Sequence, residues 1–302
     1  MQKIITHLDA QESLFLDQQL NQISDRLFDY QRPQLNAREA FPISYEGDAG
    51  AEYITFRQFD ETGEAKIIAT ASDDLPIADS VMEEYQVKVA MLGNAFAYSV
   101  KEVKSSALAN IDLESRRAMA SQKAIEQKLN MIAWSGDAKY KLQGFFNAPN
   151  IPTGTAITGN WGNPATTAQQ MYDDVQATVV AQIDLTKGVF EANEIWLPAG
   201  KLAILKSTRM ADGTDTTVAT FCEMNLNVVF KSYAECSGAG AGGKDRMVTV
   251  NKSPDNFTLE IPEELQVLAV QEINLSYKIP MYLQTAGVAV HQPFAISFTD
   301  GI

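Results

Sequence analysis

Cysteine and histidine are both scarce in this 302-residue chain. Its two cysteines, Cys222 and Cys236, form no C-x-x-C pair, and its two histidines, His7 and His291, lie far apart in the sequence. Because a zinc site needs several such ligands at short spacings, we expect no metal cluster. Two cysteines also exclude a framework of several disulfides, and a reduced, cytosolic chain is expected.

Basic residues are outnumbered, with 24 lysines and arginines against 38 aspartates and glutamates and a net charge of -14. No segment clusters the Lys and Arg that a DNA-binding surface needs, so specific nucleic-acid binding is not expected. A surface that faces nucleic acid without gripping it remains compatible with this charge. Long apolar runs are also missing, which argues against a membrane span and against a signal peptide.

The sequence does contain 45% hydrophobic residues, enough for the core of one large domain or two ordinary ones. A helix is predicted over about Val103–Trp134, a stretch without glycine or proline. At 1.5 Å per residue it would be roughly 45–50 Å long. Its small mid-seam residues favour a helix lying across a sheet over a parallel coiled coil. The predicted seam comprises Leu108, Ile111, Ser115, Ala118, Gln122, Ile125, Leu129 and Ile132.

A long hairpin is predicted before this helix. Residues Glu52–Phe59 alternate polar and apolar side chains, as a half-exposed strand does. Asp60–Glu64 is predicted as the turn and Ala65–Thr70 as the return strand. Asp73–Asp79 is interpreted as an irregular link, and Tyr85–Leu92 as a separate strand.

The remaining sequence predicts a helix near the start of the chain, Asp9–Tyr30, and a second α/β unit. After a linker loop over Thr153–Thr167, helices are predicted at Ala168–Gln182 and Gly200–Ser207. The predicted strands of this half are Glu194–Pro198, Val228–Phe230, Asp245–Asn251, Leu265–Val270, Leu275–Ile279, Val288–Val290 and Phe294–Phe298.

One segment has the spacing of a nucleotide-binding motif. Gly238–Lys244 follows the G-x-x-x-x-G-K pattern of a phosphate-binding loop. Asp245 stands where that loop needs a serine or threonine for Mg²⁺, and the β-prone residues after it do not open a helix. We therefore expect a hairpin loop that binds no nucleotide. Cys222 is expected to be a buried small hydrophobe and His291 to be structural, and no catalytic, cofactor-binding or metal-binding residue is predicted.

Several segments, taken in order, resemble a known family. Glu64–Asp79 resembles the base of an extended loop, and Tyr98–Glu102 resembles the entry to a long spine helix. Ala118–Asn130, followed by Ser135–Asp137 and Gln143–Pro149, resembles the end of that helix and the loop after it. The family is that of the major capsid proteins of tailed bacteriophages, which have the Hong Kong 97-type fold. The resemblance covers nearly the whole chain.

The resemblance implies an α+β fold with an N-terminal arm, an extended β-hairpin loop, a peripheral domain and an α/β axial domain. Phe145 departs mildly from the leucine that many members have at its position. The expected ranges are 1–45 for the arm, 46–80 for the extended loop, 81–166 with 285–302 for the peripheral domain, and 167–284 for the axial domain, with the spine helix at about 103–134.

The resemblance also implies a function. Such subunits form pentamers and hexamers that close into an icosahedral head around phage DNA, and they assemble in the host cytoplasm. The implied partners are further copies of the chain, a scaffolding protein, a portal and a decoration protein. Packaged DNA would be faced without sequence-specific binding, and no membrane is involved. Two alternatives remain open: an encapsulin-like shell around a cargo enzyme, and an unrelated α/β enzyme.

The predicted hairpin gives the candidate contacts for such assembly. An isolated two-stranded hairpin is marginally stable in water, so its apolar face should rest on a neighbouring subunit. Its charged side chains would then fix the register with that neighbour. The candidate inter-subunit residues are Tyr53, Phe56, Arg57, Phe59, Asp60, Glu61, Glu64, Lys66 and Ile67.

Overall fold

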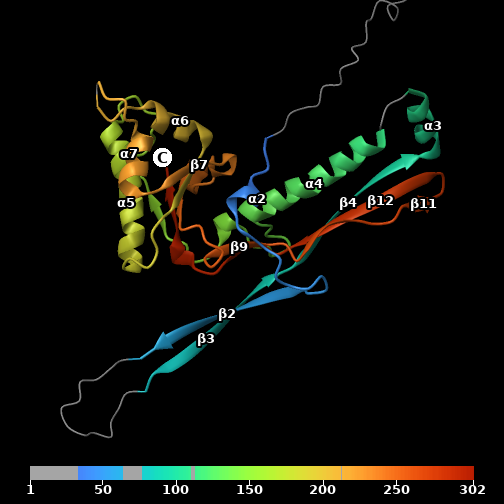
Figure 1. The fold of residues 1–302 in the computed structure, drawn as a ribbon, viewed down its shortest axis with the longest axis horizontal. Coiled ribbons are helices and arrows are strands. Elements are labelled where there is room, and N and C mark those ends of the chain that lie inside the picture. Colours follow the sequence, from blue (N-terminus) through green and yellow to red (C-terminus); the bar gives the residue numbers. More distant parts are fainter. Residues whose placement is uncertain (1–32, 64–76, 110–112, 212) are drawn as a thin grey trace, which may run out of the picture. The chain divides into compact units, whose positions relative to one another are not determined.

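The computed structural model describes residues 33–63, 77–109, 113–211 and 213–302 (Figure 1). The chain divides into two compact units, Met1–Gln34 and Leu35–Ile302. All helices and strands described below belong to the second unit. The predicted helix Asp9–Tyr30 lies outside the described residues.

One sheet has five strands in the order β5-β14-β8-β6-β7. Its strands are β5 (Thr153–Thr155), β6 (Glu194–Leu197), β7 (Val229–Ser232), β8 (Arg246–Val250) and β14 (Ile296–Asp300). Three helices accompany this sheet in Figure 1: α5 (Ala168–Thr186), α6 (Ala199–Ser207) and α7 (Val218–Leu226). The helices predicted over Ala168–Gln182 and Gly200–Ser207 are thereby confirmed.

Local sequence accounts for α5. Thr167 caps its first turn, since its Oγ1 accepts a hydrogen bond from the backbone N–H of Gln170. Met171, Val175 and Val179, spaced four residues apart, form its buried face and join one of the hydrophobic clusters. The helix ends where Lys187 adopts the left-handed conformation.

A second sheet is built on the antiparallel pair β4 (Ala90–Ser99) and β12 (Ser276–Thr285), with β10 (Glu263–Val267) and β11 (Gln271–Ile273) beside β12. The helix α4 (Leu113–Ser135) packs against β4 and β12, while α3 (Val100–Ala109) continues from the end of β4. Phe96 lies opposite Ile279, and both are buried in the cluster that also holds Leu129 of α4. Their exposed strand neighbours, Ala97 and Lys278, face away, as the period of two requires.

The smaller elements complete this unit. A three-stranded sheet has the order β1 (Ile43–Ser44), β9 (Phe257–Glu260), β13 (Gly287–Val290), and the short helix α2 (Ala37–Ala40) precedes β1. A two-stranded hairpin consists of β2 (Tyr53–Thr62) and β3 (Asp79–Lys88). Single 3₁₀ turns occur at Phe145–Asn147, Ala234–Cys236, Ala241–Gly243 and Pro293–Ala295.

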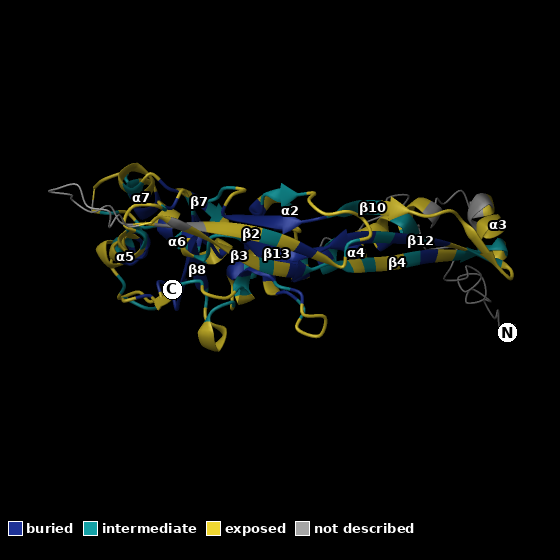
Figure 2. Ribbon diagram, turned by 90° about the horizontal axis from the view of Figure 1, so that it is seen from below, coloured by how far each residue is buried: buried dark blue, intermediate teal, exposed yellow. Residues whose placement is uncertain are grey.

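The core contains a cluster of aromatic rings. Trp134, near the end of α4, lies 4.8 Å from Phe41, 6.0 Å from Phe145 and 5.7 Å from Trp196 between ring centroids. Phe257 of β9 contacts the same group. These rings come from α4, β6, β9 and the segment after α2. The cluster therefore joins the five-stranded and three-stranded sheets to α4, the helix that packs on β4 and β12. Figure 2 shows β8 and β13 as buried and most of the β2–β3 hairpin as exposed or intermediate.

The predicted long helix differs from the structure in its limits and in its buried face. It is assigned as α3 and α4, and residues 110–112 between them are not described. Ile125, Leu129 and Ile132 are buried, whereas Leu108 is 91% exposed and Gln122 is exposed. The residue that turns inward in the middle is Ser121, which is buried. The interpretation that the helix lies on a sheet is confirmed.

The predicted hairpin was wrong in its return strand. β2 extends through Thr62, and its partner is β3, with Tyr53 opposite Lys88 and Thr62 opposite Asp79. The predicted turn at Asp60–Glu64 is therefore strand up to Thr62, and Ala65–Thr70 lies outside the described residues. A local pattern favours the nearest β-prone run, but pairing across a longer connection adds only a small entropic cost. The predicted strand Tyr85–Leu92 is divided between β3 and β4.

The sheets cross the predicted domain ranges. β12 lies almost wholly within the range expected for the axial domain, yet it pairs with β4 of the range expected for the peripheral domain. β14, in the peripheral range, pairs with β8 of the axial range. Strands from the two predicted ranges therefore share sheets, and the domain boundaries stay a prediction.

A close approach of two backbones explains the glycines after α4. Gly136 has φ +69°, and a Cβ on Gly144 would lie 2.1 Å from the Gly136 nitrogen and 2.7 Å from the Ile132 carbonyl oxygen. Both neighbours are backbone atoms, so they cannot give way as a flexible side chain does. Only glycine fits at position 144 without moving the end of α4.

We expect Gly144→Ala to destabilise the subunit by about 2–4 kcal/mol, as overpacking against rigid backbone does. Gly200→Ala is the matched control, since no atom lies within 4 Å of its Cβ position and it lies in α6. That change should be neutral or slightly stabilising. Urea unfolding followed by circular dichroism measures both, and equal midpoints for the two variants would contradict the packing argument.

Candidate self-association surfaces

The base of the β2–β3 hairpin is docked on the same subunit. Ile54 and Val87 lie opposite each other in the register and are both buried. They form a small cluster with Ala286 and Ala289, next to and within β13. This part of the hairpin therefore belongs to the subunit core and is not available to a neighbour.

Phe56 extends the same docked face. Its ring stacks on Tyr85 at 5.2 Å and meets the edge of His291 at 4.8 Å between centroids. Residues at even positions of β2 share a face, so Phe56 points with Ile54 toward the body. The sequence grouped Phe56 with Tyr53 and Phe59, but these have odd positions and lie on the other face. Phe56 is half-buried within its own subunit.

The other face of the hairpin is exposed. It carries Tyr53, Arg57 and Phe59 of β2 opposite Lys88, Glu84 and Met82 of β3, and we call it the hairpin outer face. Phe59 is 65% exposed and forms an apolar cross-strand pair with exposed Met82. Beside it, Arg57 Nε donates to Glu84 Oε1 at 2.8 Å.

The remaining candidates are only partly described. Glu61 is exposed on β2, and Asp60 lies in β2 opposite Val81. Glu64, Lys66 and Ile67 fall outside the described residues. The structure thus brings Tyr53, Arg57, Phe59 and Glu61 to one face of the hairpin.

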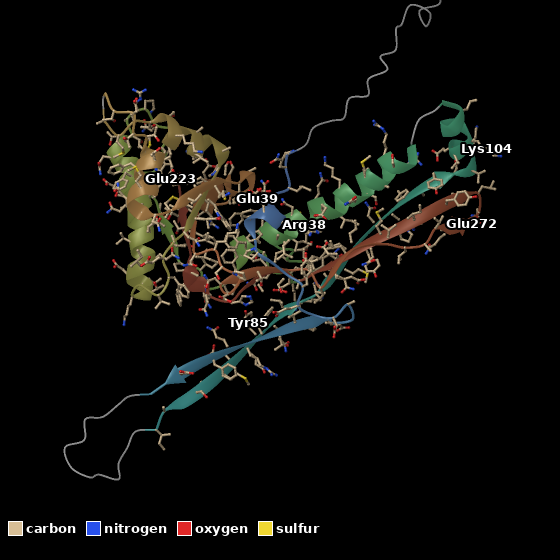
Figure 3. The ribbon with its side chains drawn as sticks, in the orientation of Figure 1. Arg38, Glu39, Tyr85, Lys104, Glu223 and Glu272 are labelled. Atoms are coloured by element: carbon tan, nitrogen blue, oxygen red, sulfur yellow. The ribbon has the colours of Figure 1, made fainter. Side chains whose placement is uncertain are left out.

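A second exposed apolar surface lies at one end of the β4–β12 sheet and was missed in the sequence. It consists of Val267, Leu268, Val270, Ile273 and Leu275, all exposed, and we call it the sheet-end surface. β10 ends at Val267 and β11 begins at Gln271, and the N–H of Val100, at the start of α3, donates to the carbonyl of Leu275. Figure 3 shows Lys104 of α3 and Glu272 of β11 at this same end. The signal in the sequence was the run Val267–Val270, which lacks the alternation of a half-buried strand.

Two arginines link the helices to this sheet. Arg38 of α2 donates to Glu126 of α4 and to Glu264 of β10, at 2.8 to 3.1 Å (Figure 3). The hydrogen bond to Glu264, more than that to Glu126, raises the pKa of Arg38. Arg117 of α4 donates to Glu102 of α3 and to the carbonyl of Ala97 in β4. Bidentate pairs of this kind fix orientation as well as adding energy.

Hydrogen bonds to Asp245 hold the two ends of the glycine-rich loop Gly238–Lys244 together. Asp245 accepts hydrogen bonds from Ser237 Oγ at 3.0 Å and from the N–H of Gly238 at 3.1 Å. The strand β8 follows directly, so the loop does not open a helix, as the β-prone residues after it predicted. Nearby, Arg246 and Asp300 form a buried pair at 2.6 Å. Burial opposes ionisation of Asp300, but the bonds from Arg246 and Ala241 hold its pKa below the usual range.

Neither cysteine lies in an exposed or reactive environment. Cys222 and Cys236 are both buried and free, and burial raises the pKa of Cys222 to about 12. No group of three or more His, Cys, Asp or Glu that could hold a metal occurs among the described residues. Within the same described residues, every helix is too short or too polar to cross a membrane.

Comparisons with known proteins bear on this fold. A model of the major capsid protein family matches residues 63–302. The chain therefore belongs to the major capsid protein family. It is a structural protein of the virion capsid, and its kind self-associates into capsid shells.

Solved structures agree with this assignment. The capsid of Myoviridae phage XM1 matches with a TM-score of 0.84 at 18% identity, over 96% of this chain and 99% of that one. The capsid of a native GTA particle matches with a TM-score of 0.67 at 13% identity, over 99% of each chain. A virus-like particle from Pyrococcus furiosus matches with a TM-score of 0.52 at 9% identity, over 87% of this chain and 91% of that one. No curated protein sequence matches.

These findings confirm the predicted α+β fold of the Hong Kong 97 type. They favour a phage capsid protein over the two alternatives that the sequence left open, the encapsulin-like shell and the unrelated α/β enzyme.

Proposed function

We propose that this chain assembles as pentamers and hexamers into a closed icosahedral head around phage DNA, in the host cytoplasm, and that it has no enzymatic activity. One observation carries the proposal. The subunit has buried hydrophobic clusters of its own, yet the hairpin outer face and the sheet-end surface remain exposed and partly apolar. A portal and a scaffolding protein would act with it, as would a decoration protein. The acid excess of the chain suits a wall that faces DNA without binding its sequence.

The hairpin outer face is the first proposed contact. Full burial of a Phe or Met side chain stabilises by about 1.5–3 kcal/mol, so covering half-exposed Phe59 and Met82 contributes a few kcal/mol at most. Arg57 and Glu84 already pair in the subunit, and an exposed pair adds little affinity. We infer that they fix register, together with Glu61, Asp60, Glu64 and Lys66, while Tyr53 and Ile67 add apolar contact.

The sheet-end surface is the second. Its five exposed apolar side chains lie on β10, on β11 and on the loop and turn beside them. Arg38 ties β10 to α2 and α4, and segments that are already held in place lose less conformational entropy when a partner binds. Each contact alone is weak. A closed shell repeats it many times, and simultaneous engagement multiplies weak affinities.

The test is electron microscopy of the expressed protein with its scaffolding partner. We expect closed shells from the wild-type chain and unassembled subunits from a Val270→Asp, Leu275→Asp double variant, because Leu275 is 78% exposed and a charge there cannot be buried cheaply. Melting temperatures should agree within a few degrees, since neither side chain is in the core. Val270→Ile with Leu275→Met keeps the surface apolar and should assemble. Wild-type protein that stays monomeric under all conditions would refute the proposed function.

A further inference from the structure

A chain of hydrogen bonds runs from the hairpin into the body. The hydroxyl of Tyr85 on β3 contacts Nδ1 of His291, and Nε2 of His291 lies 3.0 Å from Thr258 Oγ1. Thr258 Oγ1 in turn donates to Glu260 Oε1 at 2.5 Å. Thr258 and Glu260 are buried in β9, while Tyr85 and His291 are half-buried. Figure 3 shows Tyr85 where the hairpin meets the rest of the subunit.

The donors and acceptors of this chain fix the state of the imidazole. A threonine hydroxyl has one proton, and Thr258 gives it to Glu260, so Thr258 must accept from Nε2 of His291. Nε2 therefore carries the ring proton. In a neutral imidazole Nδ1 is then an acceptor, and Tyr85 must be the donor. Every proton along the chain points inward, from the hairpin to Glu260.

A second ring proton would disrupt this order. A protonated His291 has an N–H at Nδ1, directed at the hydroxyl of Tyr85. That hydroxyl would have to turn and lose its acceptor in a half-buried site, which is costly for a polar group. Phe56 and Tyr85 cover the ring, so the charge would also be poorly solvated.

We propose that Tyr85, His291, Thr258 and Glu260 form a proton-sensitive latch that holds the base of the hairpin on the subunit when His291 is neutral and weakens when it is protonated. The hydrophobic cluster of Ile54, Val87, Ala286 and Ala289 supplies the apolar part of the docking, and the latch supplies its orientation and pH dependence. The latch is a property of one subunit and does not depend on the proposed shell.

The groups around the latch set the sign. Burial lowers the pKa of His291, while Glu46 and Asp255 act in the opposite direction. Burial, and then the charge of Glu260, raises the pKa of Tyr85, which keeps the hydroxyl protonated. A released His291 would regain an ordinary pKa of about 6.5. Docking is therefore fully stabilised above that pH and weakens as the pH falls below it.

Glu260 contributes a separate titration. Burial raises its pKa, while hydrogen bonds from Thr258 and Ser44 lower it and Glu46 raises it further. A carboxyl group with a raised pKa gains a proton more readily in the folded subunit, so its effect on stability opposes that of His291 as the pH falls. Glu260→Gln removes this contribution and retains an acceptor for Thr258.

The experiment is hydrogen exchange of the full-length unassembled subunit, read on peptides of β2 and β3 and corrected for intrinsic rates. Between pH 7.5 and pH 5.5 we expect protection at the hairpin base to fall about tenfold, the limit for one coupled proton with an ordinary pKa of about 6.5 when released. His291→Gln, which cannot take a proton, should show little change between the two values. Glu260→Gln should keep the dependence.

An NMR titration and a Tyr85→Phe variant test the latch independently. The chain has two histidines, so His7→Gln leaves a single imidazole signal, and its NMR titration should report a pKa for His291 below the ordinary value. Tyr85→Phe retains the ring stack on Phe56 but removes the donor, and should weaken protection already at pH 7.5. Equal wild-type protection at both pH values, or the same fall in His291→Gln, would overturn the latch.

Discussion

We expect a variant with a shortened hairpin to fold as a subunit and to fail to form shells. In this variant an Asn-Gly turn replaces residues 58–83 and connects Arg57 to Glu84. Arg57 and Glu84 lie opposite each other in the register, so a two-residue turn can connect them without shifting the pairing. The docked base, with Ile54 opposite Val87, is kept. Phe59 and Met82 are lost, and with them the apolar part of the hairpin outer face.

Circular dichroism and thermal melting report the fold of this variant, and electron microscopy reports assembly. Its melting temperature should lie within a few degrees of wild type because the removed residues whose burial the structure describes are all exposed. Loss of cooperative melting would place the distal hairpin in the subunit core. Normal shells would show that the hairpin is not an assembly element.

Point variants separate the two faces of the distal hairpin. Phe59→Asp with Met82→Asp charges the outer face and should reproduce the assembly defect. Gln58→Ala with Glu83→Ala changes an exposed pair on the opposite face and serves as the matched control. Assembly that fails equally in both would point to strand propensity and not to a specific face.

The largest effect on folding is expected from Trp134→Ala. Trp134 is fully buried, and its ring contacts Phe41, Phe145, Trp196 and Tyr233. Truncating a buried tryptophan costs about 3–5 kcal/mol through lost transfer energy and the cavity left behind. That is a large part of the stability of an ordinary domain, so we expect a population of unfolded or aggregated subunit at 37 °C.

Met131→Ala is the control for this change, since Met131 lies on the same helix and is 44% exposed. It should cost no more than about 1 kcal/mol. Urea unfolding at 25 °C, followed by circular dichroism, compares the two. A Trp134→Ala midpoint close to that of Met131→Ala would mean that the aromatic cluster repacks and is not the centre of the core.

The sequence by itself determined the elements that depend on near neighbours. The helix α5 follows from the Thr167 cap and an apolar face repeated every four residues, and α4 from a long stretch without glycine or proline. The strand β8, directly after the loop Gly238–Lys244, follows from the β-prone residues there. The order of these local features also carried the resemblance to phage capsid proteins.

Tertiary structure alone decided what depends on distant partners. β2 pairs with β3 and not with the nearer β-prone run, and β4 pairs with β12 from the far end of the chain. Local periodicity predicts neither of these strand partners, because pairing depends on which strand faces become buried together. The same holds for Phe56 and Phe59, which look alike in sequence. One lies on Tyr85 and His291, and the other is exposed, because a period of two sends them to opposite faces of the hairpin.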